Sequence, residues 1–278
     1  MKTAPAWVEP VMRAGYGARG TVYLLVGGLA LLAAWSGGAA EDQTGALETL
    51  RGNPMGRPVL ALIALGLACY AIWRVICGAM DLEAKGTGAK GAVGRIGQVV
   101  SGLVNAGLAL SVARLAMGGQ EQGGQGSQTL TSHLLQMPAG QWLVGLLGLV
   151  VVGAGGMYVL KGWREEYREH LRFTPTMAKL APAARAGVIA HGVVIAMIGS
   201  FFLFAALHAD PSEAGGLSKA FDTVRGAAFG RMLLGALAVG MVGFGLYCWV
   251  EARARILPTR PHEGVVSMAQ RMGARLTA

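Results

Sequence analysis

Six long apolar runs alternate along the chain with shorter polar segments. Each run holds about 20 residues with almost no charge, the length that an α-helix needs to cross the hydrocarbon core of a bilayer. The runs are continuous rather than alternating in polarity, which favours helices over strands, and lipid admits only helices or closed barrels. The predicted membrane-spanning helices are Tyr16–Trp35, Pro58–Met80, Ile96–Met117, Trp142–Leu160, Ala186–Leu207 and Met232–Val250.

The composition supports the same class of protein. Of the 278 residues, 53% are hydrophobic and only 14% are charged, whereas about 25% of the residues of a soluble domain are charged. A disordered chain, a collagen and a disulfide scaffold are excluded by this composition. The first apolar run is longer than that of a cleavable signal peptide, so we interpret it as a structural helix of the mature protein.

The distribution of basic residues predicts the orientation of the protein. The net charge is +9, and most Lys and Arg residues lie in the N-terminal segment, the C-terminal tail and the loops after the second and fourth spans. The positive-inside rule therefore predicts a multi-pass protein of the inner (cell) membrane with both termini in the cytoplasm. Topology accounts for the basic residues, so we expect the lipid bilayer and no nucleic acid as a partner. The opposite side carries Arg51, Arg57, Lys219, Arg225 and Arg231.

A short motif recurs at the start of the odd-numbered spans. The pattern Arg-x-Gly-x-x-x-x-Gly occurs at residues 13–20, 95–102 and 185–192. The even-numbered spans also begin alike, with Gly followed by Arg or Gln. These starts are Gly56-Arg57, Gly140-Gln141 and Gly230-Arg231.

The repetition predicts an all-α integral membrane protein whose six transmembrane helices form three parallel two-helix repeats. Two spans per repeat give every copy the same orientation, which disfavours inverted-repeat transporters. A pseudo-threefold arrangement is the simplest closure of three such units, around either a cavity or a packed centre. The predicted repeats cover residues 13–84, 95–172 and 185–257, and a basic amphipathic tail on the cytoplasmic surface covers 258–278.

Each repeat also contains a short patterned segment between its two spans. These segments are predicted to form small amphipathic helices on the outer surface. A stretch rich in Gly and Gln, at residues 118–126, is predicted to be a flexible outer loop. The three amphipathic segments cover residues 46–50, 129–135 and 217–224.

The first repeat carries the residues of a family resemblance. It combines Gly45-Ala-Leu, Leu50, Pro54-Met-Gly56 and the run Gly66-Leu-Ala-Cys-Tyr70-Ala-Ile-Trp73-Arg74 with the Arg-x-Gly-x-x-x-x-Gly motif. With these features the chain resembles, over nearly its whole length, the bacterial Domain of Unknown Function 1206 family. The resemblance implies three two-helix membrane repeats and a membrane location, and it implies no activity.

The second repeat departs from this pattern at two positions. Gln141 replaces the arginine that follows the glycine in the other copies. Val150 stands where the other copies have Gly66 and Gly240.

One face of the odd-numbered spans carries polar groups at corresponding positions. Arg19, Ser101 and His191 are equivalent in the three copies, and Tyr23 and Asn105 lie one turn further along two of them. Residues four apart share a helix face, so inward-facing helices would bring these side chains into one polar ring. An ionisable group inside a membrane is a candidate functional site, and the ring is a candidate solute path. The structural alternative is snorkelling of the arginine and hydrogen bonding between helices.

Two further arginines lie near the ends of predicted spans. Arg74 and Arg114 are candidates for contact with anionic lipid headgroups, and plain anchoring of the topology is the alternative. The sequence predicts no metal site and no cofactor, because the cysteines lie in apolar runs without a CxxC pattern and no pair of intramembrane histidines is suited to haem. These cysteines are Cys69, Cys77 and Cys248.

Two classes of function are compatible with this sequence. The first is a small-solute or ion channel or transporter that uses the polar ring. The second is a non-catalytic membrane scaffold or accessory subunit that binds lipid, a membrane partner protein or a second copy of the chain. An enzyme is not expected, because nucleotide-binding and hydrolase motifs are missing from the sequence.

Overall fold

Six long helices form the body of the molecule, and all six predicted spans are confirmed. The computed structural model describes residues 7–36, 43–52, 55–86, 88–119, 126–166, 171 and 175–256. The predicted tail and the middle of the predicted flexible loop lie outside these residues. The long helices are α1 (Val8–Ser36), α3 (Gly56–Met80), α4 (Ala89–Ala116), α6 (Gly140–Trp163), α7 (Pro175–His208) and α9 (Gly230–Ala254).

Short helices connect the two spans of each repeat, as predicted. In the described ranges the β contacts amount to an isolated bridge between Leu171 and Arg255, and no strand forms. We call the side of the short helices the short-helix end, and the opposite side, where α3 ends and α4 begins, the basic end. The short helices are α2 (Gln43–Arg51), α5 (Gly126–Leu135), the 3-10 turn η2 (Pro211–Glu213) and α8 (Leu217–Gly226).

The first glycine of each even-numbered span is required by the short helix before it. A Cβ atom on Gly56 would overlap the carbonyl oxygen of Leu50, in the last turns of α2. The same overlap occurs between Gly140 and Leu134, the latter in α5. Glycine therefore lets the chain reverse sharply from the short helix into the span.

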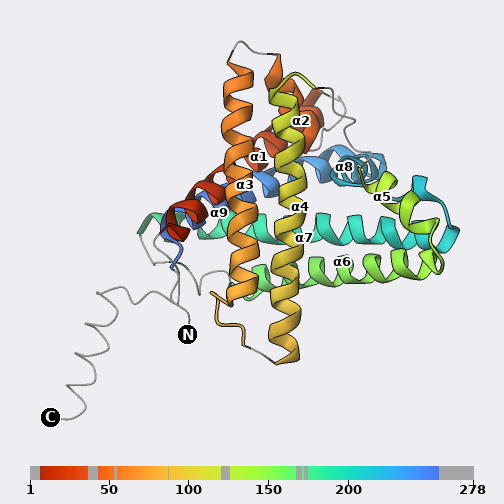
Figure 1. Cartoon of the computed structure of the whole chain (residues 1–278). Helices are drawn as coiled ribbons and strands as arrows, with labels where there is room; N and C mark the ends of the chain where they lie inside the picture. Colours follow the sequence, from red (N-terminus) through yellow and green to blue (C-terminus); the bar gives the residue numbers. More distant parts are fainter. Residues whose placement is uncertain are drawn as a thin grey trace.

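The long helices pack as three tight antiparallel pairs that diverge from the basic end (Figure 1). The pairs are α3 with α4, α6 with α7, and α9 with α1. Each pair joins the second span of one repeat to the first span of the next, and the last pair closes the cycle between the two ends of the chain. The cyclic order is that of a pseudo-threefold arrangement.

The second glycine of the repeated motif forms all three of these pairs. A Cβ atom on Gly20 would lie 2.8 Å from the carbonyl oxygen of Gly245 in α9. In the next copy, a Cβ atom on Gly102 would lie 3.0 Å from that of Ala71. In the third copy, a Cβ atom on Gly192 would lie 2.8 Å from that of Gly155. Small residues let helix backbones approach closely in membranes, and here three equivalent glycines do so.

The first glycine of the motif forms contacts within a repeat, and only two repeats have them. A Cβ atom on Gly15 would lie 2.5 Å from the Cα of Tyr70, and one on Gly187 would lie 2.7 Å from the Cα of Phe244. These glycines hold α1 on α3 and α7 on α9. The equivalent Gly97 of α4 has no described atom within 4 Å of such a position. Among the described residues, α4 and α6 make no extensive contact with each other.

The sequence of the second repeat explains this open interface. In the other two repeats, a glycine of the second span packs on an alanine of the first span. The second repeat has a bulkier valine at both positions, and both valines are exposed. The packed pairs are Gly66 with Ala18 and Gly240 with Ala190, and the valines are Val150 and Val100.

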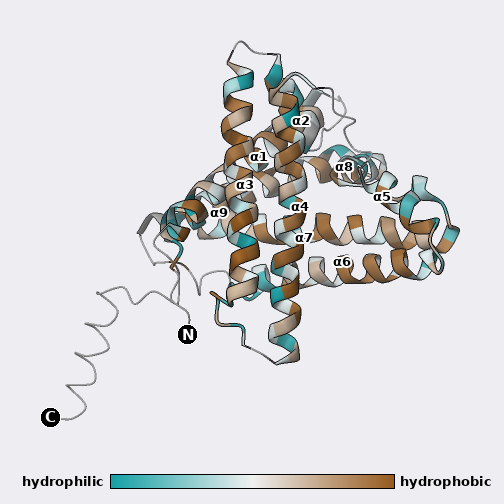
Figure 2. Ribbon diagram, in the orientation of Figure 1, coloured by the Kyte–Doolittle hydropathy of each residue, from teal (hydrophilic) through white to brown (hydrophobic). Residues whose placement is uncertain are grey.

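The open interface leaves two helices at the edge of the bundle. In the most apolar stretches of α4 and α6, 22% and 17% of the residues are buried, against 44–50% in the other four spans. The long helices carry mostly hydrophobic residues, and hydrophilic ones gather near helix ends and on connecting segments (Figure 2). This distribution is that of a multi-pass membrane protein whose outer helix faces are solvated by lipid.

Candidate functional site

A buried polar cluster, here the central cluster, lies where α1, α3, α7 and α9 meet. Its members are Arg19, Tyr23, Tyr70, His191 and Phe244. Arg19 and His191 are only 8% and 5% exposed. Arg19 donates a hydrogen bond to the hydroxyl oxygen of Tyr70, and its Nη2 lies 3.4 Å from Nε2 of His191. Because an arginine only donates, Nε2 of His191 is the acceptor in this contact.

Aromatic rings surround the guanidinium group of Arg19. Its Cζ atom lies 4.8 Å, 5.2 Å and 5.4 Å from the ring centroids of Tyr70, Phe244 and Tyr23. The ring of His191 stacks on Phe244 with centroids 3.9 Å apart. Cation–π contacts with desolvated rings are worth about 2 kcal/mol, so the rings stabilise a charge that is largely shielded from solvent.

Arg19 is nevertheless not neutralised by an acidic side chain. Over the part of the chain that the structure describes, it forms no ion pair with a carboxylate, and Nε of Arg19 and Nδ1 of His191 have no hydrogen-bond partner. A charge inside the membrane is costly and is a candidate functional group by default. The central cluster is thus a fixed positive charge held by neutral groups.

The structure brings together three residues of the predicted polar ring and leaves two outside. Arg19, Tyr23 and His191 meet in the central cluster, where the Tyr23 and His191 rings lie 5.1 Å apart. Ser101 and Asn105 lie on α4, which packs on α3 and α2 and does not reach this cluster. Asn105 donates instead to the carbonyl oxygen of Ser101, 2.8 Å away in its own helix. The predicted ring of equivalent positions from all three odd-numbered spans therefore does not form, and the second repeat reaches His191 through Tyr158 of α6, whose ring lies 5.3 Å from it.

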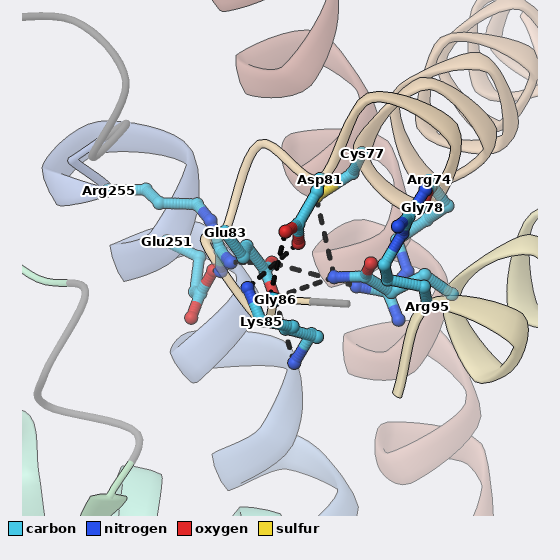
Figure 3. Close-up of polar contacts among 11 residues, drawn as sticks. Arg74, Cys77, Gly78, Asp81, Glu83, Lys85, Gly86, Arg95, Glu251 and Arg255 are labelled. Atoms are coloured by element: carbon cyan, nitrogen blue, oxygen red, sulfur yellow. Dashed lines mark hydrogen bonds and ion pairs between the residues drawn. The ribbon is translucent and has the colours of Figure 1, made fainter. Parts of the chain in front are cut away.

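A second buried cluster, here the charge cluster, lies at the basic end (Figure 3). Arg255, just after α9, forms ion pairs with Glu83 of the α3–α4 loop and with Glu251 of α9. Arg74 lies 4.0 Å from Glu83, and Lys85 lies 3.2 Å from it. The charge cluster thereby ties the loop of the first repeat to the end of the third.

Local hydrogen bonds shape the loop that presents Glu83. Asp81 adopts a left-handed backbone conformation with φ 52°, which ends α3. Its carboxylate accepts hydrogen bonds from the backbone N–H groups of Lys85 and Gly86, at 2.8 Å and 2.9 Å. The resulting tight turn directs the Glu83 carboxylate toward Arg255 (Figure 3).

The two arginines predicted to contact lipid headgroups lie in different surroundings. Arg74 points into the bundle beside Glu83, with only 14% of its side chain exposed. Its guanidinium group is thus part of the charge cluster and is not presented at the lipid-facing surface. Arg114 is exposed in the last turn of α4, at the short-helix end.

Several residues of both clusters are not predicted by the sequence reasoning. Tyr70 and Phe244 occupy equivalent positions in the second spans of two repeats. An aromatic residue repeated at this position is the sequence feature that could have identified them as neighbours of Arg19. Glu251 comes directly after the sixth predicted span, and Arg255 follows one turn later at the spacing of a helical ion pair. Glu83 has no sequence signal, because its partner is 172 positions away.

The described residues hold no group of three or more His, Cys, Asp or Glu side chains suited to a metal ion. The three cysteines, which all lie in described helices, are free. Cys77 and Cys248 are buried, and Cys69 is partly exposed. They fill space between helices, as small apolar side chains do.

Fold and clusters together define a class: a six-span helical membrane protein built from three internal repeats and fastened by buried polar contacts. The chain matches the family described as "Domain of Unknown Function (DUF1206)" over residues 14–81, 96–165 and 186–255. It belongs to this family.

One curated relative is similar over most of its length. It is the "Uncharacterized protein YxxB" of Bacillus subtilis (strain 168), which is 33% identical over 245 residues, covering 87% of this chain and 89% of the relative. No solved structure matches the chain. The family match therefore identifies the three repeats, and neither the family nor the relative indicates an activity.

Proposed function

We propose that this protein is a non-catalytic membrane scaffold or accessory subunit and that it does not conduct solutes. The observation that carries the proposal is the packing on the short-helix side of the central cluster. There the core consists of apolar side chains that are at most 2% exposed: Val26, Ala30, Val194, Leu234 and Ala238. Among the described residues of α1, α3, α7 and α9, the buried polar side chains thus extend from the basic end to the central cluster and no further.

The central cluster has a structural role in this proposal. Arg19 joins α1 to α3 through Tyr70 and to α7 through His191, so it fastens the first repeat to the third. The second repeat contributes α4 and α6 at the two edges, with faces open to the membrane. These faces are the surface on which the proposed scaffold would contact lipid or a partner protein.

The orientation of the proposed scaffold follows from its basic residues. We propose that the basic end faces the cytoplasm of the inner membrane, as the positive-inside rule predicts. Reporter fusions check this: a cytoplasmic fluorescent reporter after Ile256 is expected to be active, and a periplasmic phosphatase at the same position is expected to be inactive. The reverse pattern would overturn the orientation.

A flux measurement tests the proposal against transport. Purified protein in liposomes is expected to pass protons, chloride and small organic anions no faster than empty liposomes do. Arg19→Gln and His191→Gln are then expected to leave this baseline unchanged, as is the control Arg114→Gln on the exposed surface of α4. Flux that the wild type shows and Arg19→Gln abolishes, while Arg114→Gln retains it, would replace the scaffold with a solute path through the central cluster.

A further inference from the structure

A surface groove follows the line where α7 and α9 meet. Its volume is about 550 Å³, and its walls are apolar side chains of α7, α9 and α8. A second groove of about 390 Å³ adjoins it toward the basic end and shares Ala186 and Ile189 with it. The remaining walls of this second groove are Trp163, Glu165, Pro182 and Arg185. We call the two adjoining grooves the combined groove, which is polar at the basic end and apolar within the membrane.

Arg185 differs from the equivalent arginines of the other two repeats. Arg13 donates to the carbonyl oxygen of Arg253 at 3.1 Å, and Arg95 donates to those of Gly78 and Ala79 at 2.7 Å and 3.0 Å. Both arginines thus cap the end of the preceding repeat's second span. Arg185 instead lies 5.4 Å from the ring of Trp163, and its Nη1 lies 3.5 Å from a Glu165 oxygen. The Arg185 side chain is 40% exposed beside the second groove.

Glu165 lies beside Arg185, just past the end of α6. Its φ is 58°, in the left-handed region that residues with a side chain seldom adopt. Helices commonly end with one residue in this conformation, and Glu165 directly follows the C-cap of α6. The second groove therefore presents one positive group, one negative group and the indole ring of Trp163.

We propose that the combined groove binds one phospholipid whose headgroup carries both a phosphate and an ammonium group, as phosphatidylethanolamine does. Arg185 binds the phosphate, Glu165 binds the ammonium group, and one acyl chain lies in the apolar groove. A purely anionic headgroup would meet the Glu165 carboxylate, so the charge pattern favours the zwitterionic lipid. Ala186 to Val193 alone span about 10 Å of groove at the helical rise of 1.5 Å per residue, enough for the upper part of an acyl chain.

This inference goes beyond the proposed function and does not rest on it, because a lipid in a surface groove is compatible with either transport outcome. The protein is reconstituted in nanodiscs of phosphatidylethanolamine and phosphatidylglycerol, extracted, and weighed by native mass spectrometry. The wild type is expected to retain one phosphatidylethanolamine in preference to phosphatidylglycerol. Charge-assisted contacts are worth about 1.5–3 kcal/mol, so Arg185→Gln is expected to lower retention about tenfold or more.

Three further variants separate the headgroup from the chain. Glu165→Gln is expected to remove the preference for phosphatidylethanolamine while total retention stays near that of the wild type. Ala236→Phe fills the apolar groove from an exposed position of α9 and is expected to abolish retention. Ala61→Phe, at a similar depth on the exposed face of α3, is the control and is expected to retain the lipid. Thermal scans of each variant confirm folding before the masses are compared.

Other results would overturn the inference. They are equal retention of both lipids by the wild type, retention of a quinone or of a second copy of the chain in place of a phospholipid, and unchanged retention in a folded Arg185→Gln or Ala236→Phe variant.

Discussion

The first glycine of the repeated motif offers a test of the open interface. The same substitution, glycine to alanine, can be made at Gly15, Gly97 and Gly187. A new Cβ atom on Gly15 would lie 2.5 Å from the Cα of Tyr70, and one on Gly187 would lie 2.7 Å from the Cα of Phe244. On Gly97 the Cβ atom meets no described atom within 4 Å. One substitution at three equivalent positions therefore has two different expected results.

The magnitude follows from two opposing effects. Alanine in place of glycine inside a helix stabilises it by about 1 kcal/mol, and this gain applies equally to all three positions. Overpacking a close contact costs about 1–3 kcal/mol, and the upper part of this range applies to Gly15 and Gly187 because the obstructing atoms belong to the backbone. We expect Gly97→Ala to raise the free energy of unfolding by about 1 kcal/mol. The other two variants are expected to lie about 3 kcal/mol below it.

Equilibrium unfolding in mixed micelles of a mild detergent and dodecyl sulfate measures these differences. The second glycine supplies the matched control, because Gly20→Ala and Gly102→Ala both place the new atom within 3.0 Å of a carbonyl oxygen and are expected to destabilise alike. If Gly97→Ala lowers stability as much as Gly15→Ala and Gly187→Ala, then α4 contacts α6 in the membrane and the interface is closed.

Three further predictions concern other parts of the chain. Glu251→Gln leaves Arg255 with one buried partner fewer and is expected to lower the free energy of unfolding by about 3–5 kcal/mol, measured in the same micelles; an unchanged value would show that solvent reaches the charge cluster. The backbone N–H of Ser212, 2.8 Å away, holds the pKa of Asp210 below its ordinary value. The hydrogen bond that caps η2 is thus present at pH values above the ordinary pKa of an aspartate and is lost as the pH falls through the lowered pKa of Asp210. NMR of the Asp210 carboxyl carbon measures this titration. A midpoint at or above the ordinary pKa would contradict the prediction. The double variant Val100→Ala with Val150→Gly restores the small residues of the other repeats, so spin-label distances between α4 and α6 are expected to shorten; unchanged distances would show that these valines do not keep the helices apart.

The helical part of the fold is predictable because lipid imposes it on each segment separately. A run such as Pro58–Met80 must be helical wherever it packs, since its backbone has no other hydrogen-bond partner in the bilayer. The glycines at 20, 102 and 192 are visible in the sequence as a motif, and the structure shows what the motif does. The valine at position 150 is also visible as a departure, and its consequence is the separation of α4 from α6.

The candidate site is only partly predictable because it depends on which helices meet. Arg19, Ser101 and His191 occupy the same position in the three repeats. Arg19 and His191 contact each other and Ser101 contacts neither, and this difference depends on helix packing. The charge cluster depends on the turn at Asp81, which directs Glu83 toward a helix end from the far end of the chain. No periodicity within one segment encodes such a contact.

The closure of the helical cycle between α9 and α1 has a consequence for how the protein is made. Of the six spans, α1 is synthesised before the others and has one of its largest interfaces with α9, which is synthesised after them, so α1 lacks this partner while the other spans are inserted. During this interval Arg19 gains Tyr70 first, and it gains His191 and Phe244 only after α7 and α9 have been inserted. A chain that stops before its sixth span would expose the unfinished side of α1, and a membrane protease could recognise it there.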